Sequence, residues 1–155
     1  MKAARLHRYR EPFRLEIVDE PCLSGPYDVV VKIAAAGLCR TDIHIIERML
    51  EPFGVRLPYT PGHETGPWVE QAGPEVHAVR PGDAVLVNPN ESCGRCRPCR
   101  LGLDTYCESV RMPGFTADGG FARYLRISER GAVRLLQRSG CWSPGCRGPS
   151  RRPRR

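Results

Sequence analysis

The apolar residues of this chain come in short runs, and turn-forming residues separate one run from the next. Valine and other β-branched residues dominate several runs, which favours strands over helices. Gly73-Pro74 and Pro81-Gly82 are typical of the turns that end such strands. Many short strands between Gly/Pro turns predict a mainly β domain, built as a small barrel. The strands are expected at residues 29–34, 68–72, 76–79, 84–87 and 121–127.

Only a few short helices are expected, and the clearest one follows Cys39. Thr41 or Asp42 is a suitable cap for its first turn. Its apolar residues recur at helical spacing, namely Ile43, Ile46 and Leu50.

The net charge of +7 is not spread over the chain. Residues 137–155 contain six arginines and no acidic residue, so residues 1–136 are close to neutral. A basic face for nucleic acid is therefore not expected on the domain. No apolar run approaches the roughly 20 residues that cross a bilayer, and no apolar segment of a secretory signal follows the N-terminus. We expect a cytoplasmic protein without a membrane partner.

The pattern of the sequence changes at about residue 136. Residues 1–136 are enough for one ordinary core. Residues 137–155 are rich in Gly, Pro, Ser and Arg without hydrophobic periodicity, which predicts a disordered basic tail. We expect this segment to be an out-of-frame product of a frameshifted or truncated gene. A genuine basic interaction arm is the alternative.

Four of the eight cysteines lie within 15 residues, in a lobe expected at about residues 91–110. Their spacing is C-x2-C-x2-C-x7-C, and thiolates brought so close can surround one tetrahedral ion. Gly94, Pro98 and Gly102 allow the backbone to fold tightly around it. The motif predicts a structural zinc site. Its ligands are Cys93, Cys96, Cys99 and Cys107.

Three other interpretations compete with zinc. A disulfide framework needs an oxidising compartment, and nothing at the N-terminus points to secretion. A bacterial ferredoxin cluster needs a three-residue last gap followed by Cys-Pro, whereas here the gap is seven residues and Glu108 follows Cys107. A nucleic-acid zinc finger needs a histidine pair and a groove-binding helix, which the motif lacks. The spacing favours zinc over all three.

Three further motifs accompany the cysteine lobe. Gly37-Leu38-Cys39-Arg40-Thr41-Asp42-Ile43-His44 and Pro61-Gly62-His63-Glu64 precede it, and Asp118-Gly119-Gly120-Phe121-Ala122-Arg123-Tyr124 follows it. With these motifs in this order, the chain resembles the zinc-dependent alcohol dehydrogenases of the medium-chain dehydrogenase/reductase family. The resemblance covers about residues 1–136 and only the family's N-terminal catalytic domain, so it implies a GroES-like β-barrel. The family's Rossmann domain is expected to be absent, because no G-x-G-x-x-G sequence occurs.

The resemblance also implies a second, catalytic zinc site. Cys39 and His63 match zinc ligands of the family, and Glu64 matches a carboxylate that coordinates the metal in some states. Without the resemblance, a lone cysteine and a lone histidine are more often a buried hydrophobe and a hydrogen-bonded residue. The family's remaining ligand comes from beyond the barrel, and no matching motif follows Leu136.

The residues around Cys39 complete the implied site. Thr41 matches the hydroxyl that binds the alcohol oxygen and passes its proton on, and His44 matches the outer end of that relay, beside the cofactor ribose. Arg40 matches a position that pairs with the cofactor pyrophosphate. Asp42 is placed to orient a ligand imidazole. A helix-capping role accounts for Thr41 and Asp42 equally well, and Arg40 could equally be an ordinary solvated arginine without a cofactor contact.

The implied reaction is oxidation of an alcohol to an aldehyde or ketone, with hydride transfer to NAD(P). Zn²⁺ and NAD(P) are the implied cofactors, small alcohols or aldehydes the implied substrates, and a homo-oligomer is in keeping with the family. Since the cofactor domain is missing, we expect the chain to be inactive alone. The alternative function is a non-catalytic zinc-binding module used for folding or association.

Overall fold

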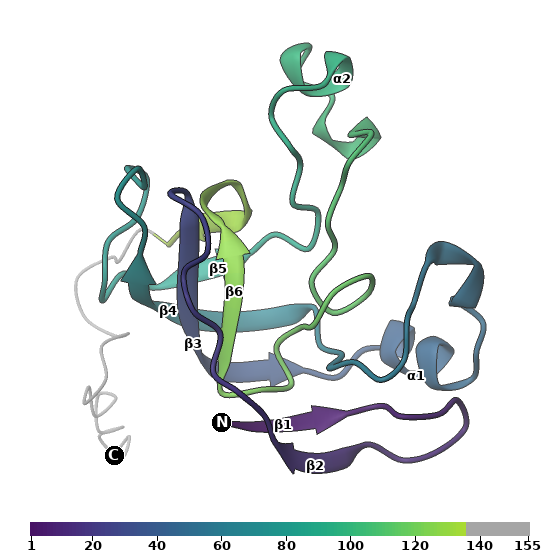
Figure 1. The fold of residues 1–155 in the computed structure, drawn as a ribbon. Coiled ribbons are helices and arrows are strands. Elements are labelled where there is room, and N and C mark those ends of the chain that lie inside the picture. Colours follow the sequence, from purple (N-terminus) through teal and green to yellow (C-terminus); the bar gives the residue numbers. More distant parts are fainter. Residues whose placement is uncertain (136–155) are drawn as a thin grey trace, which may run out of the picture.

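The computed structural model describes residues 1–135, which form a β-barrel with one projecting lobe (Figure 1). The expected domain boundary at residue 136 and the expected disordered tail at 137–155 lie outside the described residues. No helix within residues 1–135 combines the length and the apolar character needed to cross a membrane.

Three small antiparallel sheets build the barrel, as the short strands in the sequence predict. The central sheet has the strand order β4-β3-β6, and the two others pair β1 with β2 and β5 with β7. Isolated bridges between Ala3 and Ala122 and between Trp68 and Ala84 connect the sheets. The strands are β1 (Lys2–Arg5), β2 (Arg14–Ile17), β3 (Asp28–Gly37), β4 (Glu64–Ala72), β5 (Val85–Val87), β6 (Tyr124–Ser128) and β7 (Ala132–Arg134). The mainly β fold is confirmed.

Helical structure in the described part is limited to short elements of three to seven residues, again as expected. Two are α-helical and three are 3-10 turns. Their bounds are α1 (Arg40–Ile46), η1 (Glu51–Phe53), α2 (Arg97–Arg100), η2 (Asp104–Tyr106) and η3 (Glu129–Gly131).

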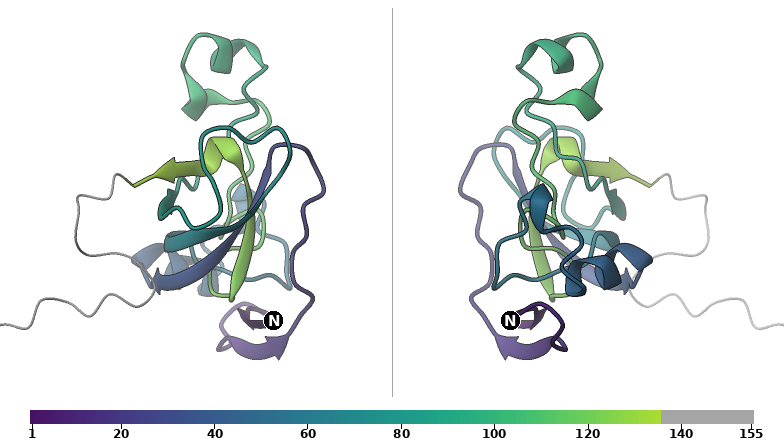
Figure 2. Two further views of the ribbon diagram at one scale, coloured as in Figure 1. Left: turned by 90° about the vertical axis from the view of Figure 1, so that its left-hand side faces the viewer. Right: turned by 90° about the vertical axis from the view of Figure 1, so that its right-hand side faces the viewer.

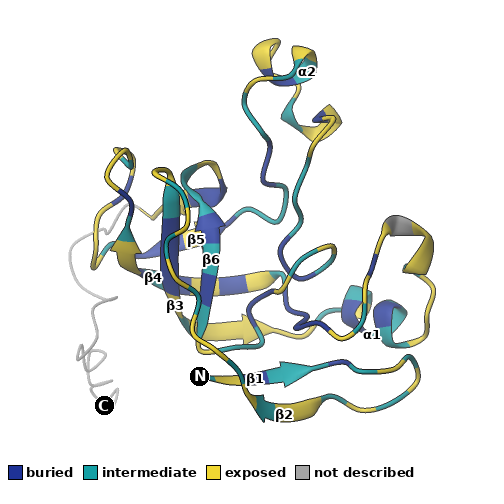
Figure 3. Ribbon diagram, in the orientation of Figure 1, coloured by how far each residue is buried: buried dark blue, intermediate teal, exposed yellow. Residues whose placement is uncertain are grey.

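The main core lies where the strands of the central sheet cross β5 and β7. Val29 and Val31 of β3 are fully buried, and the register sets them opposite Ile127 and Leu125 of β6. Burying a side chain of this size contributes about 1.5–3 kcal/mol. Figure 3 shows the buried residues concentrated in this part of the molecule, with the tip of the lobe mostly exposed. The remaining buried members are Val69, Val79, Val85, Val87 and Ala132.

A smaller second core fixes α1 against the barrel. Ile45 on α1 packs with Leu6, Val55 and Tyr59, and each of these is less than a tenth exposed. Leu6 and Tyr59 also form an isolated β-bridge. This cluster holds α1, which begins directly after Cys39, at a set place on the barrel.

Three sequence-based expectations need correction. Residues 76–79 form a loop, because the backbone N–H groups of His77 and Ala78 donate to the Glu129 carboxylate rather than to a neighbouring strand. The helix ends at Ile46 and does not reach Leu50, which still packs against the second core. The sequence pattern also missed β1 and β2, because exposed residues dominate β2 and leave no clear alternation.

The cysteine lobe projects from the barrel on two chain segments that run side by side. Both views in Figure 2 show α2 and its surroundings well clear of the sheets. Leu101 and Tyr106 in this lobe are 65% and 72% exposed, so apolar burial does little to hold it together. Its stability must come from other interactions.

Candidate metal centres

The four cysteines of the lobe converge on one point. Their sulfur atoms all lie within 4.8 Å of one another, and the Cys96 sulfur is 3.4 Å from that of Cys99 and 4.0 Å from that of Cys107. All four are free thiols. The structure thus brings together the complete predicted set, in an arrangement that can surround a metal ion.

Backbone N–H groups point at these sulfur atoms. Cys93 and Ser109 donate to the Cys107 sulfur over 3.2 and 3.4 Å, and Cys96 donates to the Cys93 sulfur over 3.4 Å. Hydrogen bonds from the backbone N–H groups of Arg95 and Cys96 lower the pKa of Cys93 to about 6. Burial raises the pKa of Cys99 to about 12, with a further contribution from the neighbouring thiols. The backbone N–H groups therefore stabilise the thiolate of Cys93, the form that binds metal, whereas burial keeps Cys99 a thiol in the absence of metal.

The loop conformation depends on two glycines. Gly94 and Gly102 have φ angles of +72° and +75°, a region in which residues with a side chain are strained. Pro98 near the start of α2 supplies a favourable first-turn residue after Cys96, the N-cap. These residues turn the chain sharply enough for four sulfur atoms to meet.

A second cluster forms where β3 ends and β4 begins. The antiparallel register sets Gly37, the last residue of β3, opposite Glu64, the first residue of β4. Cys39 lies two residues after Gly37 and His63 directly before Glu64, so the two side chains come close together. The Cys39 sulfur lies 3.1 Å from His63 Nε2, and a Glu64 carboxylate oxygen completes a group within 4.8 Å. A Cβ on Gly37 would lie 2.7 Å from Glu64 Oε2, so this position must be glycine for the carboxylate to stay. Strand pairing, not sequence proximity, makes this site.

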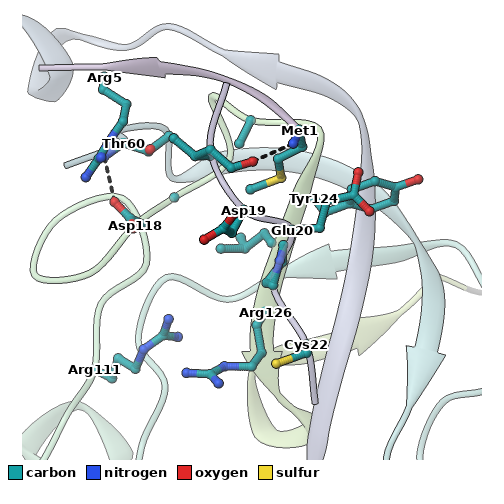
Figure 4. A pocket seen from close by; sticks show the side chains of 15 residues that line it. Met1, Arg5, Asp19, Glu20, Cys22, Thr60, Arg111, Asp118, Tyr124 and Arg126 are labelled. Carbon is teal, nitrogen blue, oxygen red and sulfur yellow. Dashed lines mark hydrogen bonds between the residues drawn. The ribbon is translucent and has the colours of Figure 1, made fainter. Parts of the chain in front are cut away.

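The loop that carries His63 is anchored by the Asp118 segment. Gly62 has a φ of +97°, and a Cβ there would lie 2.6 Å from the ring of Phe121. Gly120 donates to the Gly62 carbonyl over 2.7 Å, and Asp118 Oδ1 accepts from the Thr60 N–H over 2.7 Å. Figure 4 shows this last bond. The motif at residues 118–124 therefore supports the loop that presents His63.

Asp42 connects the helix cap to the histidine. It is fully buried, and its Oδ2 accepts a 2.9 Å hydrogen bond from the Cys39 N–H. Its Oδ1 lies 3.7 Å from His63 Nδ1, and neither atom has another partner within residues 1–135. Cys39 itself is the N-cap and Asp42 the third helical residue, which corrects the expectation that Thr41 or Asp42 would cap the helix. One carboxylate thus orients both the cysteine and the histidine.

The other predicted residues lie on α1, outside the ligand group. Thr41 donates its backbone N–H to the Cys39 sulfur over 3.2 Å. His44 Nδ1 lies 3.1 Å from the Met49 sulfur and 3.7 Å from a Glu47 oxygen. Arg40 is exposed. Their roles stay predictions.

Sequence reasoning assigned no role at the site to Phe115 or Asp118. The Phe115 ring packs on His63, with ring centroids 4.5 Å apart. Asp118 supports the His63 loop from 55 residues further along the chain. The Asp118-Gly119-Gly120 motif was a usable signal for the second residue, whereas nothing in the sequence distinguishes Phe115 from an ordinary core aromatic.

A separate cavity of about 420 Å³ has Thr60 and Asp118 among its lining residues (Figure 4). Arg5, Arg111 and Arg126 line it together with the acidic Asp19. The cavity contains none of the residues of either cysteine cluster. Because both basic and acidic side chains line the cavity, the lining does not indicate the charge of a ligand.

Comparison with known proteins supplies the family. The family model of the alcohol dehydrogenase GroES-like domain matches residues 25–137. The chain belongs to this family. The match includes both cysteine clusters of the GroES-like domain and ends at the limit of the described barrel.

Relatives of this GroES-like domain are longer proteins. An NAD-dependent alcohol dehydrogenase of Sulfurisphaera tokodaii is 39% identical over 144 residues, which cover 89% of this chain and 41% of the relative. The crystal structure of an alcohol dehydrogenase from Aeropyrum pernix matches with a TM-score of 0.83 and 43% identity, over 88% of this chain and 40% of that one. The crystal structure of galactitol-1-phosphate dehydrogenase from Escherichia coli matches with a TM-score of 0.80 and 29% identity, over 89% of this chain and 39% of that one. The chain spans about two fifths of the length of these relatives.

Proposed function

We propose that this chain is the metal- and substrate-binding part of a zinc- and NAD(P)-dependent alcohol dehydrogenase. The observation that carries the proposal is the presence of two separate ligand clusters on one GroES-like barrel. One cluster offers four thiols that would surround an ion, as in structural zinc sites. The other offers one thiol, one imidazole and one carboxylate. A free coordination position there is what a catalytic site requires.

The donor sets fit zinc at both places. The backbone N–H groups at the lobe stabilise thiolates, and the Cys39–His63 pair combines a soft and a borderline ligand. In this proposal Cys93, Cys96, Cys99 and Cys107 hold the structural ion, and Cys39, His63 and Glu64 hold the catalytic one. A zinc ion at the second site would polarise an alcohol oxygen and lower its pKa.

The residues beside this site would handle the proton. Asp42 would hold His63 in the orientation that turns Nε2 toward Cys39, as the buried carboxylate at 3.7 Å from Nδ1 supports. Thr41 Oγ1 would take up the proton of the substrate hydroxyl while it gives up its own proton, and the His44 imidazole would accept the released proton and pass it to solvent. Arg40 is exposed and free to meet a cofactor phosphate.

The nicotinamide cofactor would need a platform that residues 1–155 lack in sequence, since no G-x-G-x-x-G is present. Near-attack positioning of alkoxide and nicotinamide supplies a large part of the rate in such reactions. We therefore propose that the chain alone does not turn over. A reducing compartment such as the cytoplasm suits the proposal, because both sites depend on free thiols.

A second candidate is a non-catalytic zinc-binding module. The four-cysteine set favours it, because this set is complete within the lobe and needs no cofactor domain. The two candidates differ in whether the Cys39–His63 site binds metal and substrate.

The test combines metal analysis with cofactor binding. We expect one tight and one weaker zinc per chain, with Cys39→Ala losing only the weaker one. Cys22→Ala is the matched control, because Cys22 is exposed and lies outside both clusters. NAD binding is measured by calorimetry and NADH formation with a panel of primary and secondary alcohols. A chain without zinc contradicts the proposal. Micromolar NAD binding, or turnover abolished by Cys39→Ala, contradicts the expected inactivity.

A further inference from the structure

The cysteine lobe meets the barrel through a narrow neck of two chain segments (Figure 1). Glu91 and Arg111 face each other across it, joined by two backbone hydrogen bonds of 2.9 and 3.0 Å and a side-chain ion pair of 2.6 Å. The buried Glu91 carboxylate also accepts a 3.0 Å hydrogen bond from the backbone N–H of Ser128, at the end of β6. This contact holds the base of the neck against the barrel.

Arg130, in η3 of the barrel, makes a second connection higher up. Its Nε donates to Ser92 Oγ over 3.1 Å, and its Nη2 donates to Asp104 Oδ1 over 2.6 Å. Ser92 donates to the same carboxylate oxygen. Ser92 immediately precedes the first cysteine of the lobe, and Asp104 lies between the third and the fourth. One guanidinium therefore ties together both sides of the loop that carries the sulfur atoms.

The same carboxylate lies beside the sulfur cluster. Hydrogen bonds from Ser92 and Arg130, with a smaller contribution from the Cys99 thiol, hold the pKa of the Asp104 carboxyl below its usual value. A metal-bound Cys99 is a thiolate, which cannot donate, so the carboxylate would then face a group of like charge. The Arg130 guanidinium contacts that carboxylate directly and offsets the repulsion.

The position of the guanidinium is closely fitted. It lies over Gly94, where an added Cβ would be 3.1 Å from Arg130 Cζ and Nη1. Gly94 separates Cys93 from the rest of the loop and has the positive φ that the turn requires. The arginine thus packs on the backbone of the metal loop as well as on its side chains.

We propose that Arg130 is a positioning residue for the four-cysteine metal site. Through Ser92 and Asp104 it closes the loop around the ion, and it neutralises the carboxylate beside Cys99, so that metal leaves slowly. The inference rests on the proposed function only in that the lobe holds zinc. Arg130 is no ligand, and it belongs to the barrel, so it couples metal retention in the lobe to the fold of the barrel.

The test measures zinc release from the full chain to an excess of chelator, with a metal-sensitive dye as the readout. The slow phase of zinc release is assigned to the lobe if it is absent from the Cys96→Ala variant. Arg130→Ala should accelerate the slow phase roughly 10- to 100-fold, the usual effect of losing a residue that orients metal ligands. Arg134→Ala is the matched control, because Arg134 pairs with Asp83 at 3.2 Å on the barrel and touches no part of the lobe contact. The Arg134→Ala variant should release zinc in the slow phase at a rate within about twofold of the parent rate.

A double variant separates the charge effect from simple loosening. If Arg130 offsets the Asp104 charge, Arg130→Ala combined with Asp104→Asn should release zinc more slowly than Arg130→Ala alone. If Arg130 were only a structural clamp, the double variant would release zinc as fast or faster. Should Arg130→Ala fail to fold, Arg130→Lys keeps the charge but loses the forked contact, and should give an intermediate rate.

The outcomes distinguish this inference from the proposed site itself. A parent chain with no slowly released zinc overturns the structural zinc site and the inference with it. A parent that releases zinc slowly, with Arg130→Ala within twofold of it, overturns the role of Arg130 alone. A double variant no slower than Arg130→Ala overturns the neutralisation of Asp104.

Discussion

The two cysteine clusters hold their ligand atoms together in different ways. The lobe site takes all four sulfur atoms from residues 93–107, and the loop that carries them contributes almost no apolar burial. The Cys39–His63 site draws its ligands from the ends of two strands, 24 residues apart, on a barrel with a buried core. We therefore expect metal binding to supply much of the stability of the lobe, whereas the barrel is stabilised by its own core and offers a second candidate metal site.

This difference decides how each site should respond to damage. Metal binding at a closed structural site contributes directly to folding. At the second site the neighbouring packing, including that of Ile45 on α1 against Tyr59, keeps the ligand atoms near one another without a metal ion. Loss of metal should therefore lower the stability of the lobe much more than it disturbs the Cys39 site.

The largest expected effect is that of Cys96→Ala. Losing one of four thiolates should abolish tight zinc binding and cost at least about 3 kcal/mol, or roughly 10 °C in melting temperature. Cys39→Ala removes an N-cap acceptor as well as a ligand, and should cost only about 1 kcal/mol. Thermal unfolding of the zinc-loaded variants checks the contrast. Equal losses for the two variants would mean that the sites do not differ in this way.

The same contrast explains what the sequence could predict. The lobe site could be predicted from spacing alone, because Cys93, Cys96, Cys99 and Cys107 are local and no distant contact is needed to bring them together. The pairing of Cys39 with His63 depends on the register of β3 and β4, which spacing does not contain. It was predicted only through the resemblance to a family.

The misplaced helix cap has a similar origin. Cysteine is not among the usual capping residues, so Thr41 and Asp42 were the natural choices from the sequence. In the folded chain the Cys39 sulfur accepts the Thr41 N–H, because Asp42 is drawn inward to the Cys39 N–H and to His63. The burial of Asp42 is a tertiary effect that local propensity cannot show.

A smaller effect is expected in thiol reactivity within the metal-free lobe. The pKa of Cys93 is lowered to about 6, so this residue should be mostly thiolate at pH 7 and react readily with iodoacetamide. Its rate should rise with pH up to about 7 and then level off. The pKa of Cys99 is raised to about 12, so Cys99 should stay unreactive until well above pH 9. Peptide mapping by mass spectrometry separates the two. Equal labelling of both at pH 7 would contradict the preformed thiolate site.

The smallest effect is expected from removing residues 137–155. Their sequence has no apolar periodicity to supply a core, and their six arginines account for most of the net charge of +7. The candidate ligands of both cysteine clusters come from residues 39–107, so neither cluster should change its metal content. The melting temperature should move by no more than about 2 °C, as for surface changes in general. Circular dichroism and metal analysis of the shortened chain provide the check. A fall in melting temperature comparable to that of Cys96→Ala would show that this segment, with Trp142, stabilises the barrel. The contrast between the two cysteine clusters would then not account for the stability of the chain.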